Sequence, residues 1–313
     1  MFRFISHRLG MAVPTLLLIS VIVFALIRLI PGDPALLMLG DMADPQSLAD
    51  MRSSLGLDHS VVTQYLIWIK SVLSGDLGVS ISSRQPVLDL LVERFSVSAT
   101  VVLVAVLLAT LLAVPVGLLA AWKQNSAMDL GLVATATLLL SVPSFWLGLL
   151  LLYVFGIQLG WLPVIGYVGF GTDPMKALTY VVLPIVTLTL VEFGAIARMA
   201  RASTIEVLRL EYIAHARAKG LSESAVLWKH ALRNAFAPTW TLIGLILGNL
   251  LGGIAVLETV FTLPGIGRLM VDAIFSRDYP VLQGCLLLIT CIYVLVNLLV
   301  DLLYPLFDPR VKL

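Results

Sequence analysis

Charged residues are scarce in this sequence. Only 12% of its 313 residues are Asp, Glu, Lys or Arg, 59% are hydrophobic, and the mean hydropathy is +1.02. An ordinary soluble globular protein carries roughly twice that charge, so this class is excluded. The formal net charge of +1 gives no reason to expect nucleic acid as a partner.

Cysteine is also rare. Cys285 and Cys291 are the two in the chain, and a spacing of six residues places them well apart around a helix. They therefore cannot form a disulfide with each other, and we interpret both as small apolar residues of a packed span.

The common catalytic motifs are missing. There is no G-x-x-x-x-G-K-[ST], no H-E-x-x-H and no G-x-S-x-G, so we expect no P-loop ATP site and no catalytic residue in this chain. The four histidines, His7, His59, His215 and His230, are scattered, so no metal site is expected either.

Long apolar runs take the place of these features. Six windows approach or exceed the roughly 20 residues that a spanning helix needs: Leu9–Ile27, Phe95–Trp122, Leu130–Ile157, Ala177–Ala197 (broken only by Glu192), Asn234–Leu257 and Tyr279–Val300. The fold class predicted is an all-α polytopic membrane protein with six transmembrane helices.

An even number of spans places both termini on one side. The segments on that side hold twelve Lys and Arg, against three in the two short opposite loops. Positive residues favour the cytoplasm, so both termini are expected there. Residues 1–30 then form the cytoplasmic N-terminus and first span, 31–94 an external segment, 95–306 a core of five helices, and 307–313 a cytoplasmic tail.

The external segment contains two helix signals. Asp44-Pro45 predicts the start of a short helix that Gly56 ends. Val61–Leu73 has apolar and aromatic residues at helical spacing, which predicts an amphipathic helix. It either packs on the spans or lies on the membrane surface, and the small core available favours packing.

Some of the expected spans carry residues that kink a helix or allow close packing between helices. Ser141-Val142-Pro143-Ser144 predicts a kink. Gly244, Gly248 and Gly252 repeat every four residues, which allows another helix to approach closely, either within one bundle or from another subunit.

The acids of the spans are expected near span ends. They are Glu192, Glu258 and Asp301. We expect Glu258 to pair with Arg268 or cap the following loop. For Asp301 the expected partners are the cations Arg198, Arg201 and Lys123. A proton-coupled carrier would instead show acids or histidines in mid-span.

Between spans four and five lies a charged, helix-prone island, Glu211–Pro238. With the residues just before it, the island holds seven of the twenty basic residues. Glu211–Lys219 predicts a helix that Gly220 ends, and Ser222 is placed to cap a second helix that ends before Pro238. The alanines at 214, 216 and 218 give the first helix a shallow face for another protein. A solvated loop that only enforces topology is the competing interpretation.

This island resembles the cytoplasmic coupling loop, or EAA motif, of bacterial ABC-importer permeases of the oligopeptide/dipeptide/nickel family. Signatures along the whole chain agree with the first permease of the pair: Leu29-Ile30-Pro31-Gly32-Asp33-Pro34, Gly75-Asp76-Leu77-Gly78-Val79-Ser80, Glu258-Thr259-Val260-Phe261, Leu263-Pro264-Gly265-Ile266-Gly267, Arg277-Asp278-Tyr279-Pro280 and Asp308-Pro309-Arg310. One departure is that Ala214 stands where the motif is named for Glu, with His215 beside it.

The resemblance implies a type I ABC importer transmembrane fold in the bacterial cytoplasmic (inner) membrane. It implies a second homologous permease, two ABC ATPases that use ATP and Mg²⁺, and an external solute-binding protein, with no cofactor bound by this chain. The 198–237 loop would dock an ATPase through these residues: Glu211, Tyr212, Ala214, His215, Ala216, Arg217, Ala218, Lys219, Gly220, Leu221, His230, Leu232, Arg233 and Asn234.

The implied function is half of an ATP-driven translocation pathway for peptides or a related small solute. Short peptides are the commonest cargo of the family that the chain resembles, and nickel chelates, opines, glutathione and oligosaccharides are the alternatives. The alternative function is a self-sufficient secondary carrier or channel, which would transport without ATP or partner subunits.

Overall fold

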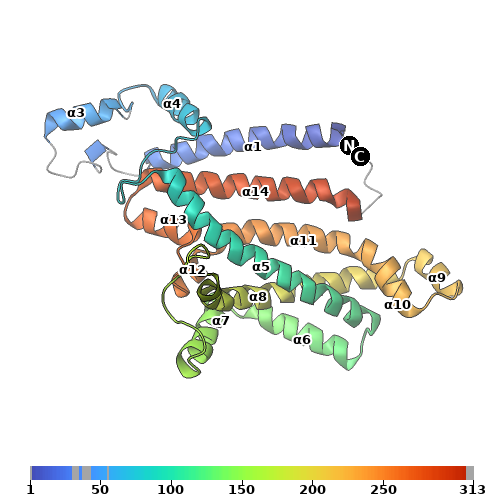
Figure 1. Cartoon of the computed structure of the whole chain (residues 1–313). Helices are drawn as coiled ribbons and strands as arrows, with labels where there is room; N and C mark the ends of the chain where they lie inside the picture. The colour runs from blue at the N-terminus through green and yellow to red at the C-terminus, as the bar shows by residue number, and fades with distance from the viewer. Residues whose placement is uncertain (1, 30–34, 37–43, 55, 308–313) are drawn as a thin grey trace.

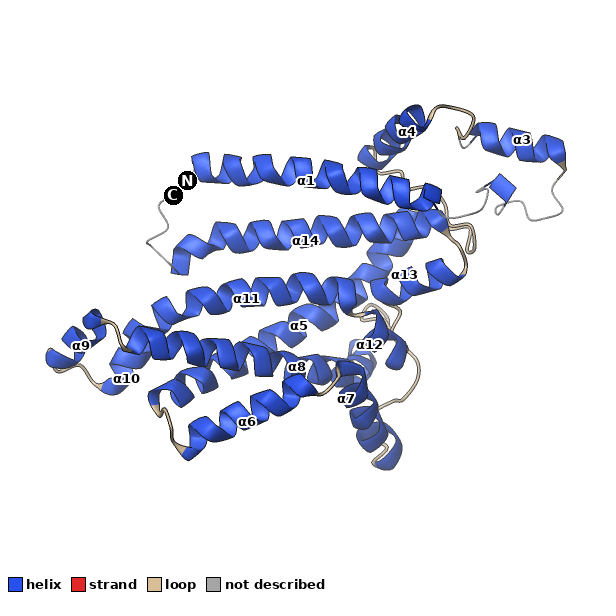
Figure 2. Cartoon of the chain, turned by 180° about the vertical axis from the view of Figure 1, so that it is seen from behind, coloured by secondary structure: helices blue, strands red, loops and turns tan. Residues whose placement is uncertain are grey.

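The computed structural model describes residues 2–29, 35–36, 44–54 and 56–307, and these residues form a helical bundle (Figures 1 and 2). The helices in chain order are α1 (Phe2–Leu29), α3 (Pro45–Ser54), α4 (Val61–Leu73), α5 (Val87–Trp122), α6 (Ala127–Ser141), α7 (Ser144–Leu151), the π-helix η1 (Leu152–Gln158), α8 (Pro174–Leu208), α9 (Glu211–Ala218), α10 (Glu223–Ala225), the π-helix η2 (Val226–Ala231), α11 (Leu232–Gly253), α12 (Ala255–Val260), α13 (Ile266–Phe275) and α14 (Tyr279–Phe307).

The core lies between α5 and α8, which pack along each other for much of their length. Gly117 of α5 makes this approach possible, because a Cβ there would lie 2.7 Å from the carbonyl oxygen of Ala197 and 2.9 Å from the Cβ of Ala200. Such close packing leaves the pair little freedom to separate.

Within the described residues, four helices are long and apolar enough to cross a membrane: α5, α8, α10–α11 and α14. The pair α6 and α7–η1 makes a fifth if counted as one span. Helix α1 lies along α14 (Figure 1) and has a shorter apolar stretch at Gly10–Ala25. Four of the six expected spans thus have long enough helices, or five if the bent pair is counted as one span, and the count of six stays a prediction.

The kink predicted at Pro143 is a bend of 96°. Helix α6 ends at Ser141 and α7 begins at Ser144. Proline cannot donate to the helical ladder and disfavours helical geometry in the residue before it, and Val142 is indeed extended, with ψ 125°. The third predicted window is therefore two helices at nearly a right angle.

Helices α3 and α4 follow their sequence signals. Asp44 accepts hydrogen bonds from the backbone N–H groups of Gln46 (3.0 Å) and Ser47 (2.9 Å), and Gly56 beyond the helix has φ +67°. The hydroxyl of Ser47 also donates to Asp44 (2.6 Å), and these bonds lower the pKa of that carboxyl.

The aromatic face of α4 packs on α1. The ring of Phe24 lies 5.3 Å from that of Tyr65 and 5.5 Å from that of Trp68, measured between centroids. A hydrogen bond of 2.7 Å joins the hydroxyls of Tyr65 and Ser20. The expected packing of this helix against the spans is confirmed.

Two of the quoted signatures meet in space. The hydroxyls of Ser80 (2.6 Å) and Ser82 (2.8 Å) and the backbone N–H of Ser82 (3.0 Å) all donate to Asp278. Burial opposes ionisation of this carboxyl, but the hydrogen bonds outweigh it and the pKa of Asp278 lies below its ordinary value. The start of α5 is thereby tied to the start of α14.

Glu258 caps the loop that follows it, one of the two roles expected. Its carboxylate accepts from the backbone N–H of Arg268 (2.8 Å) and from the hydroxyl of Ser98, which in turn accepts from the N–H of Ile266 (2.8 Å). A side chain at Gly265 would collide with this carboxylate, which explains a glycine there.

The structure differs from the sequence analysis at three points. The second island helix does not end before Pro238, because α11 continues through this residue to Gly253. Glu192 lies near the middle of α8, because this helix begins three residues before the apolar window and continues eleven residues beyond it. Arg201 does not neutralise Asp301, because its guanidinium binds Asp129.

Packing explains the first of these differences. The ladder lost at a proline is tolerated in a packed span, where neighbouring groups compensate. Asp301 lies on α14 beside α1, where both helices line a cavity of about 310 Å³.

Three of the expected segments lie outside the described residues. They are the Pro31-Gly32-Asp33-Pro34 signature, the Asp308-Pro309-Arg310 signature, and the 307–313 tail apart from Phe307.

Candidate functional site

Helix α9 protrudes at one end of the molecule (Figure 1). The beginning of α1 and the end of α14 lie at the same end, whereas α3, α4 and α13 lie at the opposite end. Helix α8 stops at Leu208, and the extended Leu210 (ψ 146°) redirects the chain into α9. The charged island is therefore a projection from the ends of α8 and α11.

A tight turn joins α9 to the returning chain. Gly220 has φ +78°, a conformation that only glycine adopts without strain, and its N–H donates to the carbonyl of Arg217 (2.9 Å). Arg217 also reaches across the turn to Glu223 with two hydrogen bonds (2.9 and 3.1 Å), which raises the pKa of the Arg217 guanidinium. The turn predicted from the glycine is thus braced by a bidentate ion pair.

The returning chain forms one continuous helical rod. The hydroxyl of Ser222 accepts from the N–H of Ala225 (3.3 Å), the cap that the sequence predicts. Helix α10 then passes through η2 into α11. The π-helical turn was not expected, and such turns are frequent at functional sites. The chain from Glu223 to Gly253 is therefore one rod that begins after the turn at the end of α9.

One side of α9 is fixed to the bundle. Ile213 is fully buried and Ala216 is 6% exposed. The amide of Asn234 donates to the hydroxyl of Tyr212 (2.7 Å), whose own proton points to the carbonyl of His230 (3.4 Å). These contacts hold α9 against the start of α11.

The other side of α9 is open. The fourteen residues expected to dock an ATPase divide into those that are exposed and those that pack against the chain itself. The exposed set on or just after α9 is Glu211, Ala214, His215, Arg217, Ala218, Lys219, Gly220 and Leu221. Tyr212, Ala216, His230 and Asn234 face or brace the chain itself, while Leu232 and Arg233 line a cavity with Pro115 and Phe307. The shallow face is therefore Ala214 and Ala218, without Ala216.

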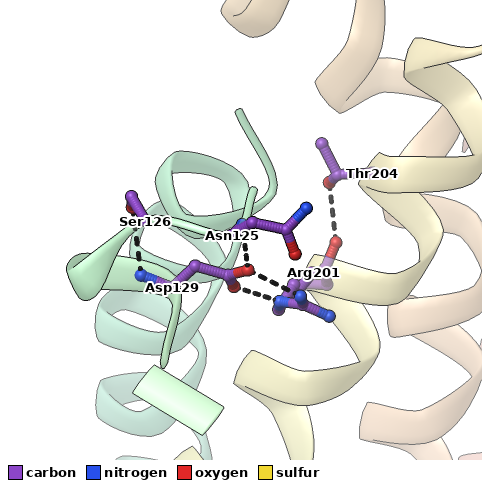
Figure 3. A network of polar contacts seen from close by, with 6 residues as sticks. Asn125, Ser126, Asp129, Arg201 and Thr204 are labelled. Atoms are coloured by element: carbon purple, nitrogen blue, oxygen red, sulfur yellow. Dashed lines mark hydrogen bonds and ion pairs between the residues drawn. The ribbon is translucent and has the colours of Figure 1, made fainter. Parts of the chain in front are cut away.

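A second polar site, which sequence reasoning missed, lies behind the loop. Asp129 of α6 accepts from Nε and Nη2 (2.7 Å) of Arg201 on α8, and from the backbone N–H of Asn125 (2.9 Å) (Figure 3). The Asp129 side chain is only 2% exposed and that of Arg201 22%. We call this the Asp129–Arg201 clamp.

A signal for half of the clamp was present in the sequence. Ser126-x-x-Asp129 has the spacing of a helix N-terminal capping pair, and the hydroxyl of Ser126 accepts from the N–H of Asp129 (3.4 Å). The partner Arg201 lies 72 residues away and had no local signal. The clamp ties α6 to α8 about two turns before α8 ends.

The glycines of α11 face α14. A Cβ at Gly248 would lie 2.7 Å from the ring of Tyr293, and one at Gly244 would overlap Val300. Gly252 has more room, with Ile289 at 3.7 Å. This face is thus used for packing inside the bundle.

The chain matches two family models. Residues 113–313 match the family described as "Binding-protein-dependent transport system inner membrane component", and residues 1–105 match the N-terminal region of such membrane components.

Curated relatives match over the full length. A "Putative peptide transport system permease protein" of Brucella abortus (strain 2308) is 41% identical over 308 residues, 98% of each chain. "Dipeptide transport system permease" proteins of Escherichia coli (strain K12) and Alkalihalophilus pseudofirmus are 40% and 38% identical, covering 100% of this chain and 99% and 100% of theirs. The bundle, the projecting loop and these matches lead to one assignment: the chain belongs to the binding-protein-dependent transport system inner membrane components, the permease subunits of ABC importers.

Proposed function

We propose that this chain is one of two homologous permease subunits that together form the pathway of a peptide importer. The full-length relatives carry peptide or dipeptide transport in their names, which supports peptides as the solute. An external solute-binding protein delivers the solute, and two ATPases that use ATP and Mg²⁺ work from the cytoplasm. The bundle crosses the membrane six times with both termini inside and residues 31–94 outside.

The exposed face of α9 carries this proposal. Ala214, Ala218 and Gly220 present little side chain there, so a groove on another protein can approach the backbone closely. Lys219 and His215 flank that face with polar groups. The opposite face is held by Ile213 and the Tyr212–Asn234 hydrogen bond, so the projection is braced against a force.

The connections of α9 suggest how such a force would act. Movement of an ATPase surface displaces α9, which the Gly220 turn and the Tyr212–Asn234 hydrogen bond connect to the rod formed by α10, η2 and α11. Helix α8 enters the same loop and is clamped to α6 by Arg201. Three helices that border a cavity would thus move together, which is what alternating exposure of a pathway needs.

A bulky side chain on the open face tests the docking role. Ala218 is exposed, so Ala218→Trp should leave folding and membrane insertion intact while blocking close approach of an ATPase. We expect the ATPases to be lost when the variant complex is purified, and ATP-dependent peptide uptake to be lost with them. Gln124→Trp, exposed on the α5–α6 turn, is the control and should retain both.

The results separate the candidate functions. If Ala218→Trp keeps its ATPases and transports peptide at the rate of the unmodified complex, α9 does not dock them. Uptake by the purified chain alone, without ATP or partners, would establish the self-sufficient carrier instead. Ala216→Asp is a poorer probe, since Ala216 packs inward and its replacement would disturb the loop itself.

A further inference from the structure

Glu192 is an acid in the middle of a long apolar helix. It lies 18 residues after the start of α8 at Pro174 and 16 before its end at Leu208, far from either end. Its side chain is partly buried. Glu192 also lies inside the apolar run Ala177–Ala197, where an ionisable group is costly and faces a partner or a wet cavity rather than lipid.

Within the described part of the chain, no hydrogen bond or ion pair to Glu192 exists. Arg201, on the same helix, is taken by Asp129. Arg198 is six residues further along, roughly 9 Å in rise and about 120° around the helix, so the two are not neighbours on one face. The charge of Glu192 is therefore left without a cation from this part of the protein.

The helical register places Glu192 beside a cavity. Residues three and seven positions further, Ala195 and Met199, share its side of α8. Both line a cavity of about 620 Å³ between α6, α8 and α11, to which Arg198, Thr137 and Leu242 also contribute. Glu192 lies one to two turns beyond this cavity, away from the α9 end.

Helical register places a second polar side chain at a similar distance beyond the cavity, on α11. Asn249 is exposed and seven residues from the cavity-lining Leu242, so it shares that face of α11. Helices α8 and α11 pack together and run in opposite directions, since the α9 loop joins them. Glu192 and Asn249 are thus each about 5–10 Å beyond the cavity, on the two helices that border it.

We propose that Glu192 and Asn249 form a binding site on the translocation pathway for a cationic group of the solute, an ammonium above all. This inference rests on the proposed function, because the free end of a peptide supplies that ammonium. A carboxylate offers the charge and an amide oxygen offers a further acceptor, whereas an anionic or neutral group would leave Glu192 uncompensated.

Cysteine labelling tests the site without relying on transport. In a chain with Cys285→Ala and Cys291→Ala, Asn249→Cys serves as a reporter in the complete complex. It is treated with an ammonium-bearing and with a neutral methanethiosulfonate reagent of similar size. We expect Glu192 to favour the cationic reagent about tenfold over the Glu192→Gln background, from one charge in a partly hydrated site.

Glu206→Gln is the matched control, an exposed acid on the same helix near the α9 end, and should leave the labelling ratio unchanged. The proposed site would be overturned if Glu192→Gln left the ratio of cationic to neutral labelling unchanged. It would also be overturned if the cysteine at position 249 reacted with neither reagent, with or without ATP. If the reporter cysteine does not react and Glu192→Gln also releases the second permease from the complex, Glu192 belongs to a contact between subunits.

Uptake measurements then identify the ligand group. With the binding protein saturated, Glu192→Gln should lower uptake of a free-amine peptide relative to its N-acetylated form, and Glu206→Gln should not. Equal effects on both peptides would refute ammonium recognition. If the unmodified complex takes up neither peptide, the peptide function fails, while the labelling ratio still decides whether Glu192 attracts cations.

Discussion

The Asp129–Arg201 clamp gives the sharpest stability prediction, because the chain contains an exposed counterpart. Asp129→Asn keeps the shape of the side chain but removes its charge and turns one acceptor into a donor that faces Arg201. Three hydrogen bonds reach the carboxylate, two of them from the guanidinium. The exposed pair Arg217–Glu223 has the same bidentate chemistry, and Glu223→Gln is the matched control.

Burial sets the expected magnitudes. A hydrogen bond between charged groups contributes about 1.5–3 kcal/mol, and water can restore part of it only at Arg201, which is 22% exposed against 2% for Asp129. We expect Asp129→Asn to lower the free energy of unfolding by about 2–3 kcal/mol. The side chains of Arg217 and Glu223 are 40% and 43% exposed, so Glu223→Gln should cost under about 1 kcal/mol.

The assay is unfolding of the purified chain in lipid nanodiscs, followed by tryptophan fluorescence at low and high salt. The small effect of Glu223→Gln should shrink as salt screens it, whereas that of Asp129→Asn should persist. Equal losses for the two variants, or a loss at Asp129 that high salt removes, would refute the argument from burial.

Two further predictions concern packing and pH. Gly244→Ala places a methyl group against Val300 and should destabilise the chain by about 1–3 kcal/mol, whereas Gly131→Ala, with open space around it, should be neutral or stabilising; the same unfolding assay compares them. Asp278 has a folded pKa below its ordinary value of 3.8, so its contribution to stability is complete above that pH and is lost as the pH falls below it. Asp278→Asn should remove this acid-dependent component, and an unchanged pH profile in the variant would contradict it.

Local chemistry made much of the fold predictable. Capping and turn residues at Asp44, Gly56, Gly220 and Ser222 act within a few positions of themselves, so their helices were located from the sequence. The apolar windows likewise located the long helices, because hydropathy over 20 residues depends on nothing else in the chain.

Contacts between distant segments could not be predicted in this way. The pairing of Asp129 with Arg201, and of Asp278 with Ser80, depends on which helices lie together. The place of Glu192 within its helix could not be predicted either, because the apolar window was taken as the helix, while α8 continues eleven residues past it into polar sequence. Ala214, Ala216 and Ala218 were likewise expected on one open face of α9, whereas Ala216 packs inward.

The tie between Ser80 and Asp278 has a consequence for biosynthesis. The two residues are 198 positions apart, so the ribosome makes the serine long before its acceptor exists. At about 5–20 residues per second the delay is on the order of 10–40 s. During that time the segment that leads into α5 lacks its final neighbour, and the synthesis of α14 supplies the contact that holds it.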